Sequence, residues 1–89
     1  MRAVITVIGK DMVGILAAIS GICADSRVNV IEVTQSVLQE FFAMIMLVDT
    51  SASTSSFKEL QQRLTQAGES MGLSVHLMHE DIFQSMHRI

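Results

Sequence analysis

The residues best placed for chemistry in this sequence form the segment Gly9-Lys10-Asp11-Met12-Val13-Gly14-Ile15. An apolar, strand-like run from Ala3 to Ile8 precedes it, and a helix-like run from Ile15 to Cys23 follows it. A loop that leads from a strand into a helix presents backbone N–H groups without partners in the helix. Such groups bind the carboxylate of a small ligand. Because Asp11 repels a simple phosphate or sulfate, the loop favours a zwitterion, which carries both charges.

The histidines and nearby acidic residues suggest a second chemistry, metal binding. The residues concerned are His76, His79, His87, Glu80 and Asp81. On a strand, His76 and His79 point to opposite faces because their separation is odd. A structural zinc site offers four close ligands at recognisable spacings, which this set lacks. We therefore predict no metal site, no cofactor and no catalytic residues.

Composition limits the partners of the chain. Its 89 residues suffice for one domain, and 49% of them are apolar, which is more than one small core uses and predicts a self-association surface. A net charge of -3 with six Lys and Arg argues against nucleic-acid binding. No apolar run approaches the ~18 residues that span a membrane. The single Cys23 fits a reducing compartment and a buried helix face, so we expect a cytoplasmic protein.

Alternating strand and helix patterns position the loop. Strands are predicted at Ala3 to Ile8, Val28 to Leu38, Phe41 to Val48 and Leu73 to Met78, and amphipathic helices at Ile15 to Cys23 and Phe57 to Met71. The order β-α-β-β-α-β predicts an α+β, ferredoxin-like sandwich with a four-stranded antiparallel sheet and two helices on one face. We predict one domain over 1–89, with a core of 1–80 and a helical tail, 81–89, that carries Ile82, Phe83, Met86 and Ile89.

Several residues predict how the elements begin, end and pack. Asp11 is a candidate N-cap of the first helix. Gly21 inside that helix suggests that another element packs closely there. Ser56 and Glu59 have capping-box spacing, and Gly72 is a candidate C′ residue of the second helix.

The second and third strands make predictions about the two sheet faces. Simple alternation along the second strand predicts two faces. One face carries Val28, Val30, Glu32, Thr34 and Ser36, and the other carries Asn29, Ile31, Val33, Gln35 and Val37. After a tight turn near Leu38-Gln39-Glu40, the third strand is apolar on both faces, so neither face should meet water. We expect the tail, a partner subunit, or both to cover the face opposite the helices.

The ordered set of motifs resembles an ACT domain. The matching segments are Asp11-Met12-Val13-Gly14-Ile15-Leu16 and Val28-Asn29-Val30-Ile31. The chain is most similar to the small, stand-alone ACT proteins of bacteria and archaea, which also resemble the glycine-cleavage repressor type. The family often has Pro before the glycine, where this chain has Val13.

The resemblance implies a regulatory module that binds a small molecule, an amino acid in most cases, between two subunits. One subunit would contribute Asp11, Met12, Val13, Gly14, Ile15 and Leu16, and the other Asn29, Val30 and Ile31. It therefore implies a homodimer that signals through a protein effector, with edge strands side by side or sheets face to face. Because many ACT domains bind no ligand, the alternative is a structural or interaction subunit whose sheet face mediates association.

The single residues also have structural interpretations. Gly14 allows either a ligand or a packed neighbour to approach the backbone, and Asn29 serves either a ligand or a local turn. Three other functions of this topology are disfavoured. The loop lacks the arginine of an acylphosphatase, the first strand lacks the aromatic residues of an RNA-recognition module, and no Cys-x-x-Cys pair supports a metal chaperone.

Overall fold

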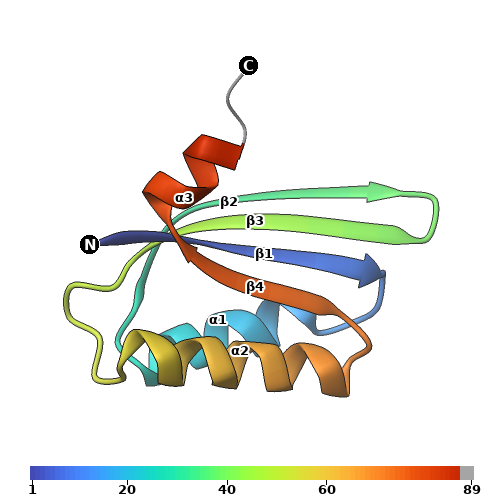
Figure 1. Ribbon diagram of the computed structural model, residues 1–89. Coiled ribbons are helices and arrows are strands. Elements are labelled where there is room, and N and C mark those ends of the chain that lie inside the picture. The colour runs from blue at the N-terminus through green and yellow to red at the C-terminus, as the bar shows by residue number, and fades with distance from the viewer. Residues whose placement is uncertain (87–89) are drawn as a thin grey trace.

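The computed structural model describes residues 1–86 as a single layered α+β unit (Figure 1). The elements are β1 (Arg2–Lys10), α1 (Ile15–Asp25), β2 (Asn29–Leu38), β3 (Phe41–Asp49), α2 (Phe57–Ser70), β4 (Ser74–His79) and α3 (Glu80–Met86). The predicted order of strands and helices is confirmed, and each predicted end of the four strands and the two long helices lies within two residues of the observed one. His87 and Ile89 of the predicted tail lie outside the described residues.

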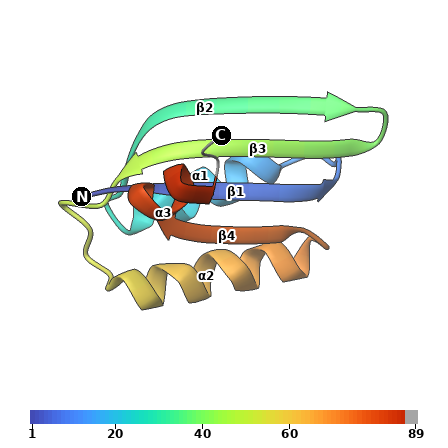
Figure 2. The same cartoon turned by 45° about the horizontal axis from the view of Figure 1, so that its top comes forward.

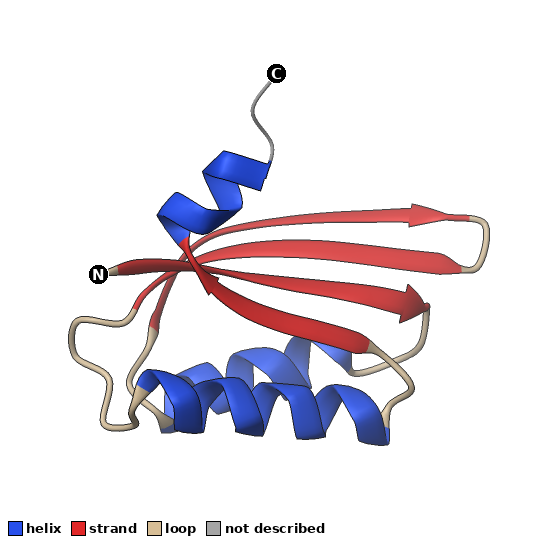
Figure 3. Cartoon of the chain, viewed as in Figure 1, coloured by secondary structure: helices blue, strands red, loops and turns tan. Residues whose placement is uncertain are grey.

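The four strands form one antiparallel sheet in the order β2-β3-β1-β4. α1 and α2 cover one face, and α3 lies on the other (Figure 3). α1 packs against β2, and α2 packs against β4. We call the face that carries α3 the open face. Within 1–86, no helix is both long and apolar enough to span a membrane.

The core lies between the sheet and the two long helices. Alternate residues of β3 point into it, and Met44, Met46 and Val48 are at most 1% exposed. Cys23 on α1 is 1% exposed in the same core, as predicted, and burial raises the pKa of its thiol. On the other side of β3, Phe41 and Ile45 are 61% and 42% exposed on the open face of the single chain. α3 therefore covers that face only in part.

A β-bulge corrects the predicted faces of β2. Val30 pairs with Val48, and Glu32 pairs with Leu47, so the extra residue between them is Ile31. Opposite residues of an antiparallel pair share a face. Val30 thus lies on the helix-covered face with Val33 and Val37, whereas simple alternation placed it on the other face. A bulge places two residues of one strand opposite one residue of the partner strand. The apolar pattern of β2 alone therefore does not reveal it, because the bulge is a property of the pairing.

The ends of α2 form as the sequence predicts. The Ser56 hydroxyl accepts from the Glu59 backbone N–H at 3.1 Å, and the Glu59 carboxylate accepts from the Ser56 N–H at 3.0 Å, which completes a capping box. The Ser56 backbone N–H that donates to the Glu59 carboxylate, together with the Ser56 side chain, lowers the pKa of Glu59. At the other end, Gly72 has a φ of 72°, and Leu73 N–H donates to the Gly68 carbonyl at 2.8 Å. This is a Schellman motif.

Gly21 contradicts its predicted packing role. A Cβ built on Gly21 would meet no atom within 4 Å, and the residue is exposed. Gly68 on α2 is the glycine that packs closely, since its Cβ would lie 2.5 Å from the Val75 side chain and 3.0 Å from the Leu73 carbonyl oxygen. Close packing of a helix on the sheet therefore depends on Gly68 of α2 and not on Gly21 of α1.

We predict that Gly21→Ala raises the free energy of unfolding by ~1 kcal/mol, because alanine lowers the entropic cost of helix formation at an uncrowded site. Gly68→Ala is the matched substitution at a crowded helical site and should lower the same quantity by ~1–3 kcal/mol. Urea denaturation followed by circular dichroism measures both. A destabilised Gly21→Ala protein would show that something covers this side of α1.

Candidate functional site

The loop between β1 and α1 ends in a glycine that the backbone geometry requires. Gly14 is the N-cap of α1 and has φ 93° and ψ 6°, in the left-handed region. A Cβ at this position would meet nothing within 4 Å. Of the two interpretations of Gly14, close packing is therefore excluded, and glycine is required here by the positive φ. The space above the glycine is open to an incoming group.

Asp11 does not cap the helix, in contrast to the prediction. Gly14 takes the N-cap position, and no side chain caps α1. The first intrahelical bond runs from the Ala18 N–H to the Gly14 carbonyl at 2.9 Å, so the N–H groups of the first turn have no helical acceptor. The Asp11 N–H instead donates to the Glu40 carbonyl at 2.7 Å. This bond fixes the start of the loop to the β2–β3 hairpin and leaves the Asp11 carboxylate exposed.

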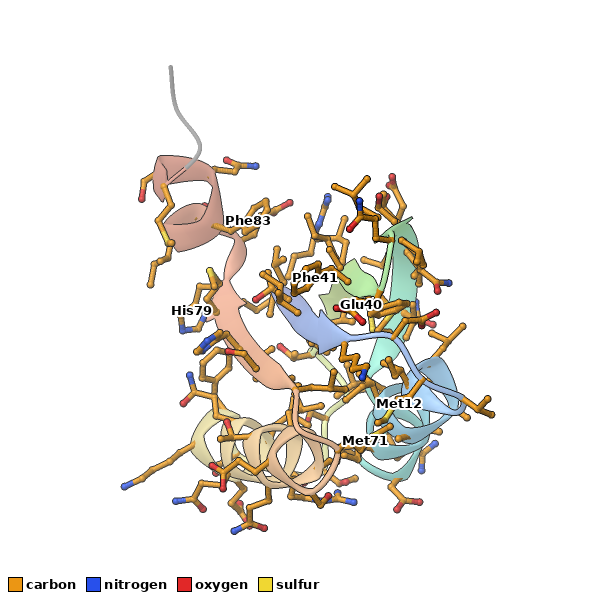
Figure 4. The ribbon with its side chains drawn as sticks, turned by 90° about the vertical axis from the view of Figure 1, so that its right-hand side faces the viewer. Met12, Glu40, Phe41, Met71, His79 and Phe83 are labelled. Carbon is orange, nitrogen blue, oxygen red and sulfur yellow. The ribbon has the colours of Figure 1, made fainter. Side chains whose placement is uncertain are left out.

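The other predicted loop residues divide by exposure. Met12, Val13 and Leu16 are 44%, 100% and 40% exposed, whereas Ile15 is 2% exposed and belongs to the core. Figure 4 shows Met12 at the start of α1, on the helix side of the sheet. The Ile15 side chain can therefore take no part in a surface site, and only its backbone N–H is available there.

Asn29 lies at the opposite end of the sheet from the loop. It is the first residue of β2 and pairs with Asp49, which in turn pairs with Arg2 at the start of β1. Lys10, at the loop end of β1, pairs with Phe41 instead. Nine residues of strand separate the two ends, which corresponds to ~30 Å. One chain therefore does not bring the two predicted halves of the site together.

The Asn29 side chain is not used to build the turn before β2. Backbone bonds form that turn: Val28 N–H donates to the Cys23 carbonyl at 2.8 Å, and Arg27 N–H donates to the Ala24 carbonyl at 3.1 Å. Arg27 takes the left-handed conformation, with φ 57°. Among the described residues, no hydrogen bond involves the exposed Asn29 amide. The amide is thus available for a ligand or a partner.

A charged carboxylate stands next to Asn29. The Ser51 hydroxyl and backbone N–H donate to Asp49 at 2.6 and 2.8 Å. These two bonds lower the pKa of Asp49 to about 2, so the group is ionised at neutral pH. Sequence reasoning did not single out Asp49, because nothing in the chain order relates it to Asn29. Only the β2–β3 register places them opposite each other.

The histidines lie on opposite faces, as predicted. His76 pairs with Thr6 on the open face, and His79 pairs with Ala3 on the helix-covered face. The His79 ring stacks on Phe57 with a centroid distance of 4.3 Å and an interplanar angle of 8°. Within the described part of the chain, no three His, Cys, Asp or Glu side chains are grouped as ligands of one ion. His87 lies outside that part.

Known proteins are similar to this chain in sequence and in fold. The family model described as the ACT domain matches residues 2–78. A UPF0237 protein of Clostridium acetobutylicum is 45% identical over 89 residues, which is 100% of each chain. An ACT domain protein from Streptococcus pneumoniae has a TM-score of 0.80 and 32% identity, over 94% of each chain. A protein described as a glycine cleavage system transcriptional repressor has a TM-score of 0.73 at 19% identity, over 85% of this chain and 43% of its own, and it shares the fold.

We predict that Gly14→Ala lowers the free energy of unfolding by ~1–2 kcal/mol, because an L side chain is strained at positive φ. Gly14→Asn should cost less, since asparagine tolerates this region. Because the site is uncrowded, the difference between the two reports backbone strain and not a clash. Urea denaturation measures both values, and a neutral Gly14→Ala would contradict the left-handed cap.

Proposed function

The chain belongs to the ACT domain family, and we propose that it is a regulatory module of the cytoplasm that binds an amino acid between two copies of itself. In this proposal the module performs no catalysis. It binds the ligand and transmits the bound state to a protein effector. Neither a nucleic acid nor a membrane takes part.

The observation that carries the proposal is the position of the two half-sites on one sheet. The Asp11 to Gly14 loop lies at the hairpin end, and Asn29 lies at the other end of the edge strand β2 (Figure 1). A long, exposed edge strand is a template for pairing, and β2 exposes Ile31, Val33 and Val37. If two β2 edges pair antiparallel about a two-fold axis, the Asn29 end of one copy lies beside the hairpin end of the other.

The chemistry of the two halves fits an α-amino acid. The first-turn N–H groups of α1 from one copy would bind the ligand carboxylate. The Asp11 carboxylate of the same loop would attract the ammonium group, and so would the ionised Asp49 beside Asn29 of the second copy, which also pairs with its own N-terminal ammonium at 3.4 Å. The Asn29 amide offers both a donor and an acceptor. The exposed Met12, Val13 and Leu16 offer apolar contact to a ligand side chain.

This arrangement gives a simple regulatory mechanism. A ligand held by two copies binds the dimer more tightly than the monomer, so it shifts the association equilibrium toward the dimer by that difference in affinity. A coupling of ~1–3 kcal/mol is usual for such linkage. An effector that binds the dimer would then report the ligand concentration.

A second candidate function rests on the open face. Ile8, Phe41 and Ile45 remain 57%, 61% and 42% exposed there. A structural or interaction subunit without a ligand would use this face to associate with a protein. The two functions differ in one measurable property, because only the first makes association depend on an amino acid.

We predict that two variants that each fail to bind the amino acid regain binding when they are combined in one dimer. Gly14→Ala and Asn29→Ala should each abolish the heat of binding of the cognate amino acid in isothermal titration, once a screen of the standard amino acids has identified it. Refolded together, they form mixed dimers with one intact pocket, which restores about a quarter of the wild-type sites because half of the dimers are mixed.

Gln35→Ala removes an amide from the same strand outside the proposed pocket and is the matched control, which should keep full binding. Two results would contradict a pocket shared between subunits. The first is that Gly14→Ala or Asn29→Ala alone still binds the amino acid. The second is that the mixture fails to bind it although mass spectrometry shows mixed dimers. Unchanged sedimentation on adding any amino acid to the wild-type chain would favour the second candidate.

A further inference from the structure

The edge of the sheet away from β2 is formed by β4, and α2 runs beside it. The two elements are neighbours in Figure 1 and in Figure 2, and they pack against each other. Residues of both line a hollow of about 630 Å³, among them Lys58, Gln61, Thr65 and Glu69 of α2 and Leu77 of β4. Every lining residue of α2 except Gln61 is exposed, so the hollow opens to the surface. We call it the α2–β4 groove.

The β4 edge presents backbone groups to this groove. In an antiparallel pair the N–H and C=O of one residue point to the same side, and the side alternates along the strand. The Leu77 carbonyl accepts from the Gln61 side-chain amide at 3.0 Å, so the backbone groups of Leu77 point away from β1. Those of Val75, two residues earlier on β4, point the same way. Leu77 and Val75 therefore each direct a donor and an acceptor out of the sheet.

The Gln61 amide shows which chemistry the β4 edge accepts. A side-chain amide carries the same kind of N–H donor as a peptide group. Gln61 places this donor on the Leu77 carbonyl, where the N–H of an added strand would also bind. Strand edges of this kind pair with an extended chain of another protein. Such a chain would replace the one side-chain bond and gain further backbone bonds at Val75.

Two charges in the groove are placed against the dipole of α2. The helix spans Phe57–Ser70, so Lys58 lies in its first turn and Glu69 in its last turn. A helix is stabilised by acidic residues at its start and by basic residues at its end, and these two residues have the opposite signs. Within the described residues, neither of them forms an ion pair. Their charges therefore do not stabilise the helix and are available to a partner.

The separation of the two charges defines the segment that fits. Lys58 and Glu69 are eleven residues apart, which is three helical turns plus ~20°, so they share one side of α2 at ~16 Å along its axis. An extended chain covers ~13 Å in four residues, and long side chains span the difference. Phe57 stacks on His79, so the Lys58 end of the groove is the end at which β4 finishes. A strand antiparallel to β4 therefore passes Lys58 first and Glu69 second.

We propose that the α2–β4 groove binds an extended segment of another protein as a fifth strand, antiparallel to β4. The segment carries an acidic residue opposite Lys58 and, four residues later, a basic residue opposite Glu69. This surface deepens the proposed function, on which it rests for the existence of a protein effector. Because β4 and β2 are opposite edges of the sheet, pairing of β2 with a second copy leaves the groove open.

Two peptides of identical composition test the order of the charges. Each is a fluorescein-labelled chain of alternating Thr and Val that contains one Glu and one Lys four residues apart. Glu precedes Lys in the first peptide and follows it in the second. The first should bind the wild-type chain at least about threefold more tightly in fluorescence anisotropy, because the second turns two attractions into repulsions. Equal affinities, a preference for the second peptide, or no binding of either at ~1 mM would overturn the proposal.

An exchange of the two charges on the protein is the matched variant. Lys58→Glu with Glu69→Lys keeps the net charge and agrees with the dipole of α2, so the variant should fold at least as stably as the wild type. It should prefer the second peptide by a similar factor. If the variant keeps the wild-type preference, the peptides bind elsewhere and the proposal is overturned.

Amide exchange followed by nuclear magnetic resonance locates the added strand. The first peptide should slow exchange of the Val75 and Leu77 N–H groups, because its carbonyl groups accept their bonds. The His76 and Met78 N–H groups point toward β1 and are the internal reference. Binding without slower exchange at Val75 and Leu77 would overturn strand addition. These experiments contain no free amino acid, so their failure is distinct from a failed amino-acid titration, which alone would contradict the proposed ligand site.

Discussion

The register of β3 with its two neighbours determines which residues one chain can bring together. β3 pairs Phe41 with Lys10 at one end of the sheet, and it pairs Asp49 with both Arg2 and Asn29 at the other end. The loop that follows β1 and the start of β2 are thereby held a full strand length apart. Because hydrogen bonds fix both pairings, no movement within one folded chain can join the two half-sites. The proposed pocket therefore requires a second copy.

The sequence predicted those features that depend on local patterns. A continuous apolar run gave β3, the Ser56 and Glu59 pair gave the start of α2, and Gly72 gave its end. Each of these signals acts over a few residues and is satisfied within the same element. The same patterns gave the order of the elements, which the structure confirms, and the family model confirms the resemblance to ACT domains.

The features that sequence reasoning missed depend on contacts between distant segments. The bulge at Ile31 appears only in the pairing with β3, and it reverses the expected face of Val30. Asp11 has a suitable side chain for a cap, but its backbone bonds Glu40 and the left-handed Gly14 takes the cap position. Gly21 and Gly68 look equivalent in two helices, yet only Gly68 faces a strand that crowds it. The role of Asp49 likewise follows from its register and not from its position in the chain.

Amide hydrogen exchange distinguishes a β2 edge that is paired with a second copy from one that is open to water. The outward N–H groups of β2 should exchange slowly in the native assembly, because the partner strand accepts their bonds. The outward N–H groups of β4, at the other edge of the same sheet, provide an internal reference and should exchange quickly. Equal, fast exchange at the two edges, at concentrations where the chain is associated, would contradict the account.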